Sequence, residues 1–196
     1  MCAVVILAGG KSRRMGFDKL SLPLGGRTLL EAAVSRFGDE FEDVYISVAD
    51  AGKYPDIEAR RIVDILPGAG PLSGLHAALT ELHCGGVFLV AADLPFSSPR
   101  AAKRIIELCA GKEAAVLELP NGMLEPLFGY YSASLLRLCV DAIESGEYKL
   151  AGILRVADTR FVRVEELGAL WDEKMILNIN RPEDFDKAAI EFSRGQ

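Results

Sequence analysis

The chain has 196 residues, of which 50% are hydrophobic and 26% are charged, and its formal net charge at pH 7 is -6. This composition is typical of a globular protein, and the length predicts one domain over residues 1–196 with a buried core. The acidic balance excludes a protein that holds nucleic acid by general phosphate neutralisation, because that mode needs an excess of Lys and Arg over one face.

Short apolar runs alternate with amphipathic helical patterns along the chain. The expected strands cover residues 3–7, 44–48, 61–63, 87–91, 114–119, 124–131, 160–164 and 175–179. The cations near the first of these runs follow it, which predicts a buried strand rather than a signal peptide. A turn at Pro120-Asn121-Gly122 is expected to join 114–119 and 124–131 into a small antiparallel hairpin.

Helices are expected between most of these strands. Thr28 and Glu31 form a capping box before apolar residues at helical spacing, and Ser98 precedes Pro99 as an N-cap. Further helices are expected over 71–82 and 134–145 and from Pro182 onward. Strands that alternate with helices predict a three-layer α/β sandwich with a mainly parallel, Rossmann-like sheet. Ligands bind such sheets at the carboxyl ends of the strands.

The four cysteines are scattered along the chain at Cys2, Cys84, Cys109 and Cys139. They form no C-x-x-C pair and have no histidine at zinc-finger spacing, which argues against a disulfide framework and a structural zinc site. This pattern predicts reduced thiols in a cytoplasmic protein. No apolar stretch approaches the ~20 residues that span a bilayer, so contact with a membrane is not expected.

The stretch LAGGKSRRMGFDK, residues 7–19, places a cluster of cations directly after the first expected strand. Glycines at the carboxyl end of a strand let backbone N–H groups approach a phosphate. Two common phosphate-binding patterns fail here on spacing. G-x-G-x-x-G fails because Gly9-Gly10 is followed by glycine only at Gly16, and the P-loop fails because its first glycine would fall at Val5.

Residues 7–19 match every fixed position of L-A-G-G-x-S-x-R-M-G-x-D-K, and by this signature the chain resembles the molybdenum cofactor guanylyltransferase family. The resemblance implies a nucleotidyltransferase fold. It extends over nearly the whole chain through Asp64, GPLSG at 70–74, ADLP at 92–95, EPLF at 125–128, NIN at 178–180 and PED at 182–184.

The resemblance also implies a reaction. GMP passes from GTP to the terminal phosphate of the molybdenum-molybdopterin cofactor, with Mg²⁺ as cofactor and pyrophosphate as the leaving product. The nucleophile is a phosphate monoester whose second pKa is about 6, so it is largely ionised at neutral pH and needs no general base. Transient contact with cofactor-biosynthesis proteins or molybdoenzymes is expected, and contact with nucleic acid is not.

Arg14, Lys19 and Asp93 are the candidate catalytic residues that the resemblance implies. Arg14 and Lys19 would neutralise the triphosphate where charge builds up in the transition state. Asp93 follows a strongly apolar strand, where a carboxylate without a partner is expensive, and is the expected Mg²⁺ ligand; a turn former beside Pro95 is the alternative. The expected nucleotide-binding residues are Leu7, Ala8, Gly9, Gly10, Lys19, Asp64, Gly70, Asp93 and Asn180.

For several residues the sequence leaves open whether they take part in the site. Lys11 and Arg13 either contact phosphate or face solvent, and Glu125 either points into the cleft or does not. Asn180 is either a ligand for the metal or phosphate or a turn former. Ala49 lies in a segment where the family commonly has an Asn that contacts the nucleotide, so that contact is missing or replaced here.

Two other functions stay open from the sequence. One is a related cytidylyltransferase or sugar-phosphate nucleotidylyltransferase. Related cytidylyltransferases carry L-A-A-G where this chain has L-A-G-G, so the absent methyl group at Gly9 would either leave room for guanine or permit a backbone contact. The other is a GTP-binding adaptor without catalysis, against which the retained Arg14, Lys19 and Asp93 argue, because an adaptor needs no metal-bridged α-phosphate.

Overall fold

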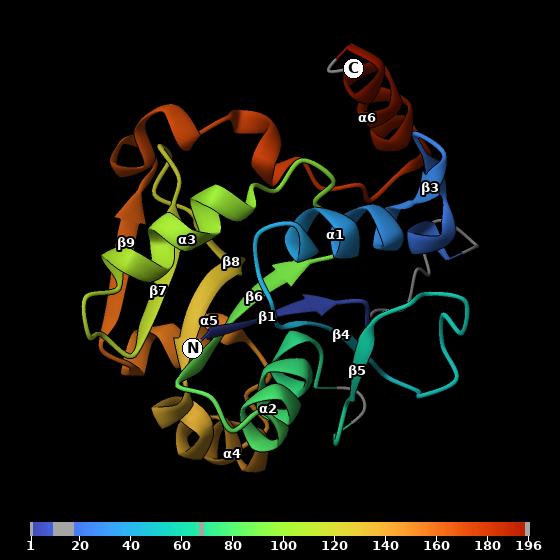
Figure 1. Ribbon diagram of the computed structural model, residues 1–196. Helices are drawn as coiled ribbons and strands as arrows, with labels where there is room; N and C mark the ends of the chain where they lie inside the picture. The colour runs from blue at the N-terminus through green and yellow to red at the C-terminus, as the bar shows by residue number, and fades with distance from the viewer. Residues whose placement is uncertain (1, 10–17, 67–68, 195–196) are drawn as a thin grey trace.

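The computed structural model describes residues 2–9, 18–66 and 69–194, and a seven-stranded sheet lies at its centre (Figure 1). The strand order across this sheet is β5-β4-β1-β6-β8-β7-β9. The strands are β1 (Cys2–Leu7), β4 (Val44–Val48), β5 (Arg60–Val63), β6 (Gly86–Ala91), β7 (Ala114–Glu118), β8 (Leu124–Ser132) and β9 (Thr159–Arg163). Each of them begins and ends within one residue of the range that the sequence predicts.

The sheet is mainly parallel, as predicted. β8 pairs antiparallel with β6 and with β7, and the other pairings described in this sheet are parallel. The predicted hairpin is therefore confirmed as β7 and β8. Because β4, β1 and β6 run in the same direction, their carboxyl ends meet at one edge of the sheet.

Helices cover both faces of the sheet, which confirms the three-layer sandwich (Figure 1). One face carries α1 (Leu29–Gly38) and α3 (Pro99–Leu108), whose Phe37 and Ile105 share a buried core with Phe88. The other face carries α2 (Pro71–Glu81), α4 (Leu136–Glu144) and α5 (Leu150–Val156), which form a second core with the opposite side of the sheet. No helix in the described part of the chain is long and apolar enough to cross a membrane.

The predicted helix starts are confirmed in atomic detail. The Thr28 hydroxyl accepts from the Glu31 N–H (3.2 Å), and the Glu31 carboxylate accepts from the Thr28 N–H (2.7 Å), so the capping box opens α1. These hydrogen bonds to Thr28 lower the pKa of Glu31. The Ser98 hydroxyl accepts from the Ala101 N–H (3.2 Å) and caps α3. Local side chains thus fix where both helices on this face begin.

The start of α2 depends on two glycines. Gly70 precedes Pro71 at φ 57°, in the left-handed region that other residues rarely adopt. A Cβ at Gly74 would lie 2.6 Å from both Leu7 Cδ2 and Ser47 Oγ. The absence of a side chain at Gly74 therefore lets α2 pack directly on the ends of β1 and β4.

The strand predicted over 175–179 is wrong. Residues 173–176 form a 3-10 turn, and the backbone of Ile179 makes one hydrogen bond beyond the end of β6, to the Asp93 carbonyl oxygen (3.0 Å). Since β6 already has β1 and β8 as neighbours, the sheet offers no free edge at this place. Met175 and Ile176 join the core that contains Phe88, and Leu177 and Ile179 pack against a helix and a hairpin instead.

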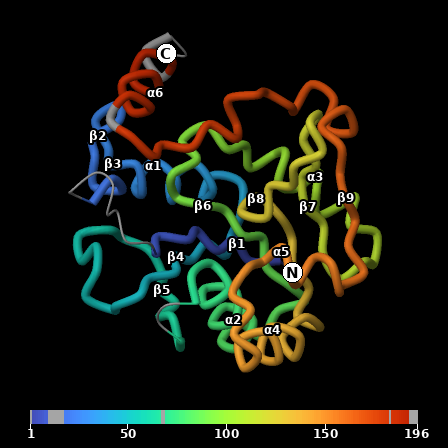
Figure 2. Tube along the Cα trace, turned by 180° about the vertical axis from the view of Figure 1, so that it is seen from behind, coloured from blue at the N-terminus to red at the C-terminus, as the bar shows by residue number. Residues whose placement is uncertain are grey.

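That packing builds a small third core outside the main layers. It contains Leu24, Leu29, Ile179 and Ala188. The elements that meet there are the hairpin β2 (Pro23–Leu24) and β3 (Arg27–Thr28), the first turn of α1, and α6 (Pro182–Arg194). Figures 1 and 2 show α6 beside β3, apart from the helices that cover the sheet. This core holds the segment around Ile179 close to the carboxyl edge.

Candidate active site

Several of the predicted site residues gather at the carboxyl edge of the sheet. Gly9 follows β1, Asp64 follows β5 and Asp93 follows β6. Hydrogen bonds tie these strand ends together: Ala92 N–H donates to the Leu7 carbonyl (3.2 Å), and Asp64 N–H donates to the Val48 carbonyl (2.9 Å). The parallel topology therefore places these residues as the sequence predicts.

Lys19 connects three parts of this edge. It begins η1 (Lys19–Ser21), and its ammonium forms an ion pair with Asp93. The same Nζ donates to the Ile179 carbonyl (2.7 Å) and to Asn180 Oδ1 (3.2 Å). The three donors of an ammonium thus have three oxygen acceptors. The structure brings together Lys19, Asp93 and Asn180, from segments that are far apart in the sequence.

The turn that carries Asp93 is held from α1. The Arg36 guanidinium donates to the Pro95 carbonyl (2.5 Å), the Leu94 carbonyl (3.2 Å) and the Ser97 hydroxyl (3.2 Å). Burial lowers the pKa of Arg36 to about 10, so the group stays charged at neutral pH. A charged donor bonded to three oxygens of one turn fixes the direction in which Asp93 projects.

Asn180 is held from α6 in a similar way. One Asp184 carboxylate oxygen accepts from the Asn180 N–H (3.0 Å) and from the Arg181 N–H (2.9 Å). Asp184 lies in the first turn of this helix and fixes the turn before it. The exposed Asn180 side chain is therefore presented to Lys19 by an anchored backbone.

Asp64 lies on the other side of β1. The buried Ser47 hydroxyl donates to Asp64 Oδ1 (2.9 Å), and Asp64 Oδ2 lies 3.7 Å from where a Cβ on Gly9 would be. Burial raises the pKa of Asp64, and the Ser47 hydrogen bond opposes that shift. A partly buried carboxylate that faces the glycine-rich turn suits a ligand group with hydrogen-bond donors. Ser47 was not predicted as a site residue, because its only signal in the sequence is a polar residue within an apolar strand.

Glu125 lies on the Asp93 side of the edge. Burial raises the pKa of Glu125, and the charge of Asp93 contributes to the same shift. Its side chain accepts from the Leu127 N–H (3.2 Å). The β7–β8 register shifts between Val116 and Leu117, where Gly129 and then Glu125 are the partners, and irregularities of this kind are frequent next to active sites. Glu125 therefore lies close enough to Asp93 to feel its charge, and its orientation into a cleft stays a prediction.

Some of the remaining residues predicted to bind the nucleotide lie in the described part of the chain, and others do not. The side chains of Leu7 and Ala8 are buried in the two main cores, and Ala8 N–H donates to the Ser47 carbonyl (2.9 Å). Gly70 is exposed at the start of α2. Contact of these residues with a nucleotide stays a prediction. Four predicted or open positions lie outside the described residues: Gly10, Lys11, Arg13 and Arg14.

The described residues contain no group of three His, Cys, Asp or Glu side chains that could hold a metal ion. At this edge the Lys19 ammonium is surrounded by three oxygens, from one carboxylate, one side-chain amide and one backbone carbonyl. Such a partial set suits Mg²⁺, which takes one or two carboxylates and completes its shell with water and substrate phosphates. A mainly parallel sheet whose polar residues gather at this edge defines the class of open-sheet α/β proteins, in which ligands bind at the carboxyl ends of the strands.

Comparison with known proteins narrows that class. The family model for the MobA-like NTP transferase domain matches residues 4–164. The chain is 33% identical to a probable molybdenum cofactor guanylyltransferase of Methanosarcina mazei, over 94% of this chain and 88% of that protein. It is 36% identical to a probable molybdenum cofactor guanylyltransferase of Pyrococcus furiosus, over 93% of each chain.

A solved structure gives the same result. The crystal structure of molybdopterin-guanine dinucleotide biosynthesis protein A from Archaeoglobus fulgidus matches with a TM-score of 0.85 and 29% identity, over 98% of this chain and 99% of that one. The chain belongs to the MobA-like NTP transferase family.

Proposed function

We propose that this protein transfers GMP from GTP to the terminal phosphate of the molybdenum-molybdopterin cofactor. An oxygen of that phosphate attacks the α-phosphorus of GTP, a new P–O bond forms, and the bond to the β-phosphate breaks to release pyrophosphate. Supporting this are the names of the relatives and the convergence of Lys19, Asp93 and Asn180 on one edge of the sheet. That convergence is the observation on which the proposal depends.

The chemistry needs few protein groups. The attacking phosphate monoester is ionised at neutral pH, so no side chain has to remove a proton. Positioning and charge stabilisation supply most of the acceleration in phosphoryl-type transfer. The Lys19 ammonium lies at the carboxyl edge of the sheet, and in this proposal it neutralises the triphosphate. Arg14, from the same signature, is proposed for the same task.

Mg²⁺ dependence is part of the proposal. Asp93, Asn180 and the Ile179 carbonyl are the groups that would hold the ion, and all three already bind a cation, the Lys19 ammonium. Bound there, Mg²⁺ would supply charge stabilisation for the phosphate oxygens of the transition state. Gly9, Asp64 and Gly70 are proposed for the nucleotide, with Leu7 and Ala8 as the strand end that supports them.

The decisive experiment measures product formation. The wild-type protein, incubated with GTP, Mg²⁺ and molybdenum-molybdopterin, should release pyrophosphate and form the guanine dinucleotide, detected by mass spectrometry. Asp93→Asn keeps the size of the side chain and removes its charge, and should lower kcat/KM about a thousandfold, or about 4 kcal/mol. Asp158→Asn is the matched control, because Asp158 is an exposed carboxylate that also pairs with a lysine.

Three outcomes would contradict the proposal. If CTP or a sugar phosphate is the better substrate, the protein is one of the related nucleotidylyltransferases. If GTP binds and no pyrophosphate appears, the adaptor function is correct. If Asp93→Asn transfers GMP as fast as the Asp158 control, Asp93 does not hold the metal.

The proposal also includes the domain organisation, the cellular location and the protein partners. We infer one nucleotidyltransferase domain over residues 1–196, a cytoplasmic location, and transient contact with cofactor-biosynthesis proteins or molybdoenzymes. The four cysteines are all free, which supports a reducing compartment. Crosslinking of the protein in cells followed by mass spectrometry would test the predicted contacts.

A further inference from the structure

Residues 49–59, between β4 and β5, contain a backbone conformation that needs support. Tyr54 has φ 54°, in the left-handed region where residues other than glycine are uncommon. Such a conformation persists when the surrounding structure holds it in place, and it is frequent near functional sites. Hydrogen bonds connect the Tyr54 segment to Arg61 on one side and to Asp18 on the other.

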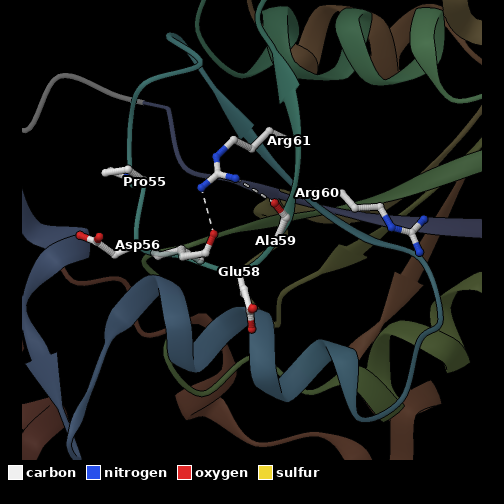
Figure 3. A pocket seen from close by; sticks show the side chains of 7 residues that line it. Pro55, Asp56, Glu58, Ala59, Arg60 and Arg61 are labelled. Carbon is white, nitrogen blue, oxygen red and sulfur yellow. Dashed lines mark hydrogen bonds between the residues drawn. The ribbon is translucent and has the colours of Figure 1, made fainter.

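Arg61 holds the backbone of this segment. Its guanidinium donates to the carbonyl oxygens of Tyr54 (2.7 Å), Ile57 (2.9 Å) and Ala59 (3.1 Å). Figure 3 shows the Arg61 side chain turned back toward Ala59, whereas the neighbouring Arg60 points away. One charged group bonded to three carbonyls closes the loop and keeps Tyr54 in its unusual conformation.

The Tyr54 hydroxyl reaches out of this loop to the glycine-rich signature. Its oxygen lies 2.7 Å from Asp18 Oδ2 and 3.5 Å from the Ala8 carbonyl oxygen. The hydroxyl has one proton, and the shorter contact identifies Asp18 as its main acceptor. Burial and the neighbouring Asp18 carboxylate raise the pKa of Tyr54, so the hydroxyl stays protonated. Ala8 and Asp18 are the two residues that flank residues 9–17.

Asp18 passes this restraint on to Lys19. The second carboxylate oxygen of Asp18 accepts from the Leu20 N–H (3.1 Å) and caps η1. Lys19 is the first residue of η1, and its ammonium pairs with Asp93. Two hydrogen bonds through the Asp18 carboxylate therefore connect the Tyr54 hydroxyl to the turn that sets the direction of Lys19.

We propose that Tyr54 is a positioning residue, whose hydroxyl holds the Asp18 carboxylate and, through it, the start of η1 in the place that presents Lys19 to the triphosphate. This inference rests on the proposed function for its effect on GTP. The ring of Tyr54 packs against the core that contains Phe88, and this packing does not depend on the hydroxyl. The proposed effect on Lys19 therefore comes from the hydroxyl alone.

The test is Tyr54→Phe, which removes the hydroxyl and keeps the ring. Loss of a hydrogen bond to a charged acceptor should raise KM for GTP about tenfold, while KM for the pterin substrate stays unchanged. A smaller amount of folded protein would lower kcat and leave KM alone, so the change in KM separates positioning from simple destabilisation. Tyr45→Phe is the matched control, because the Tyr45 hydroxyl also contacts a charged group, Arg60, at 3.0 Å.

A double-mutant cycle identifies the path. Asp18→Ala should raise KM for GTP, and Tyr54→Phe should add nothing in that background, because its acceptor is already gone. The inference is overturned if Tyr54→Phe leaves KM for GTP at the value of the Tyr45 control. It is equally overturned if the Tyr54 and Asp18 effects on KM multiply independently.

A second measurement needs no substrate. Hydrogen exchange at the Leu20 amide should be about tenfold faster in Tyr54→Phe than in the wild type or the Tyr45 control, because the Asp18 cap is no longer held. Unchanged exchange contradicts the inference. This result stands whether or not the wild-type protein transfers GMP, so failure of the inference and failure of the proposed function can be told apart.

Discussion

Replacing Lys19 with methionine should have opposite effects on metal binding and on catalysis. The Lys19 ammonium lies among the Asp93 carboxylate, the Ile179 carbonyl and Asn180 Oδ1, the three oxygens that we propose for Mg²⁺. A metal ion at these oxygens has to displace the ammonium. Lys19→Met keeps an unbranched side chain of similar length and removes the competing charge.

The size of the effect follows from the contacts that are lost. A hydrogen bond to a charged group contributes about 1.5–3 kcal/mol, and the side chains of Lys19 and Asp93 are each 17% exposed, so solvent screens part of their attraction. We take the lower end, about 1.5 kcal/mol for the whole displacement, which corresponds to about tenfold tighter metal binding. The Asp93 carboxylate left without its partner favours metal binding in the same direction.

The assay uses Mn²⁺ as a paramagnetic substitute for Mg²⁺, titrated by electron paramagnetic resonance without nucleotide. Lys19→Met should bind Mn²⁺ about tenfold more tightly than the wild type, and Mg²⁺ should raise its unfolding midpoint by more. Transfer of GMP should fall about a hundredfold or more, because the ammonium no longer stabilises the triphosphate. Lys112→Met is the control, since Lys112 is an exposed partner of Asp158 at 2.9 Å.

Equal or weaker Mn²⁺ binding in Lys19→Met would refute this reasoning. It would mean either that the metal binds elsewhere or that the ammonium does not compete for these oxygens. Equal gains in Lys19→Met and Lys112→Met would refute it as well, because they would reflect the net charge of the protein rather than this site.

Two further substitutions test the nucleotide side of the edge. Gly9→Ala should fold normally, because its Cβ would lie 3.7 Å from Asp64 Oδ2, an ordinary contact, and it should reduce the preference for GTP over CTP about tenfold in kcat/KM; an unchanged ratio would place selectivity elsewhere. Asp64→Asn should raise the unfolding midpoint at neutral pH and weaken GTP binding in calorimetry, because burial raises the pKa of Asp64 and makes its charged form costly. The sign of the pH dependence follows: the wild type recovers stability as pH falls through the raised pKa toward 3.8, so the advantage of Asp64→Asn should shrink there, and an advantage that is constant with pH would contradict the burial argument.

Local signals in the sequence predicted most of the framework. Alternating apolar runs and helical patterns located the strands of the sheet, and the Thr28 capping box located the start of α1, because these features depend on neighbouring residues. The helix α5 was not predicted. It has seven residues and no side-chain cap, so its signal in the sequence is weak. The strand predicted over 175–179 was wrong because the apolar residues of this segment resemble a strand, and only the complete strand order shows that β6 has neighbours on both sides.

The candidate site was predictable as a set of residues and not as a set of contacts. The signature located Lys19, and the expected strand end located Asp93, which was expected to need a metal as its partner. In the structure Lys19 is that partner, 74 residues away in the chain. Tyr54 was missed because nothing in its surrounding sequence predicts a left-handed conformation or a contact with Asp18, 36 residues away. Contacts of this kind depend on the folded topology.

The pairing of charged side chains at this edge predicts that Mg²⁺ and GTP bind cooperatively. Asp18 and Asp64 accept hydrogen bonds from neutral hydroxyl groups, whereas Lys19 and Asp93 form an ion pair with each other. A nucleotide alone would leave Asp93 without its partner, and a metal alone would displace Lys19 into solvent. The metal–nucleotide complex supplies one charge of each sign and replaces both partners together. Since linkage is reciprocal, Mg²⁺ should tighten GTP binding by the same factor as GTP tightens Mg²⁺ binding, and that factor should fall in Lys19→Met.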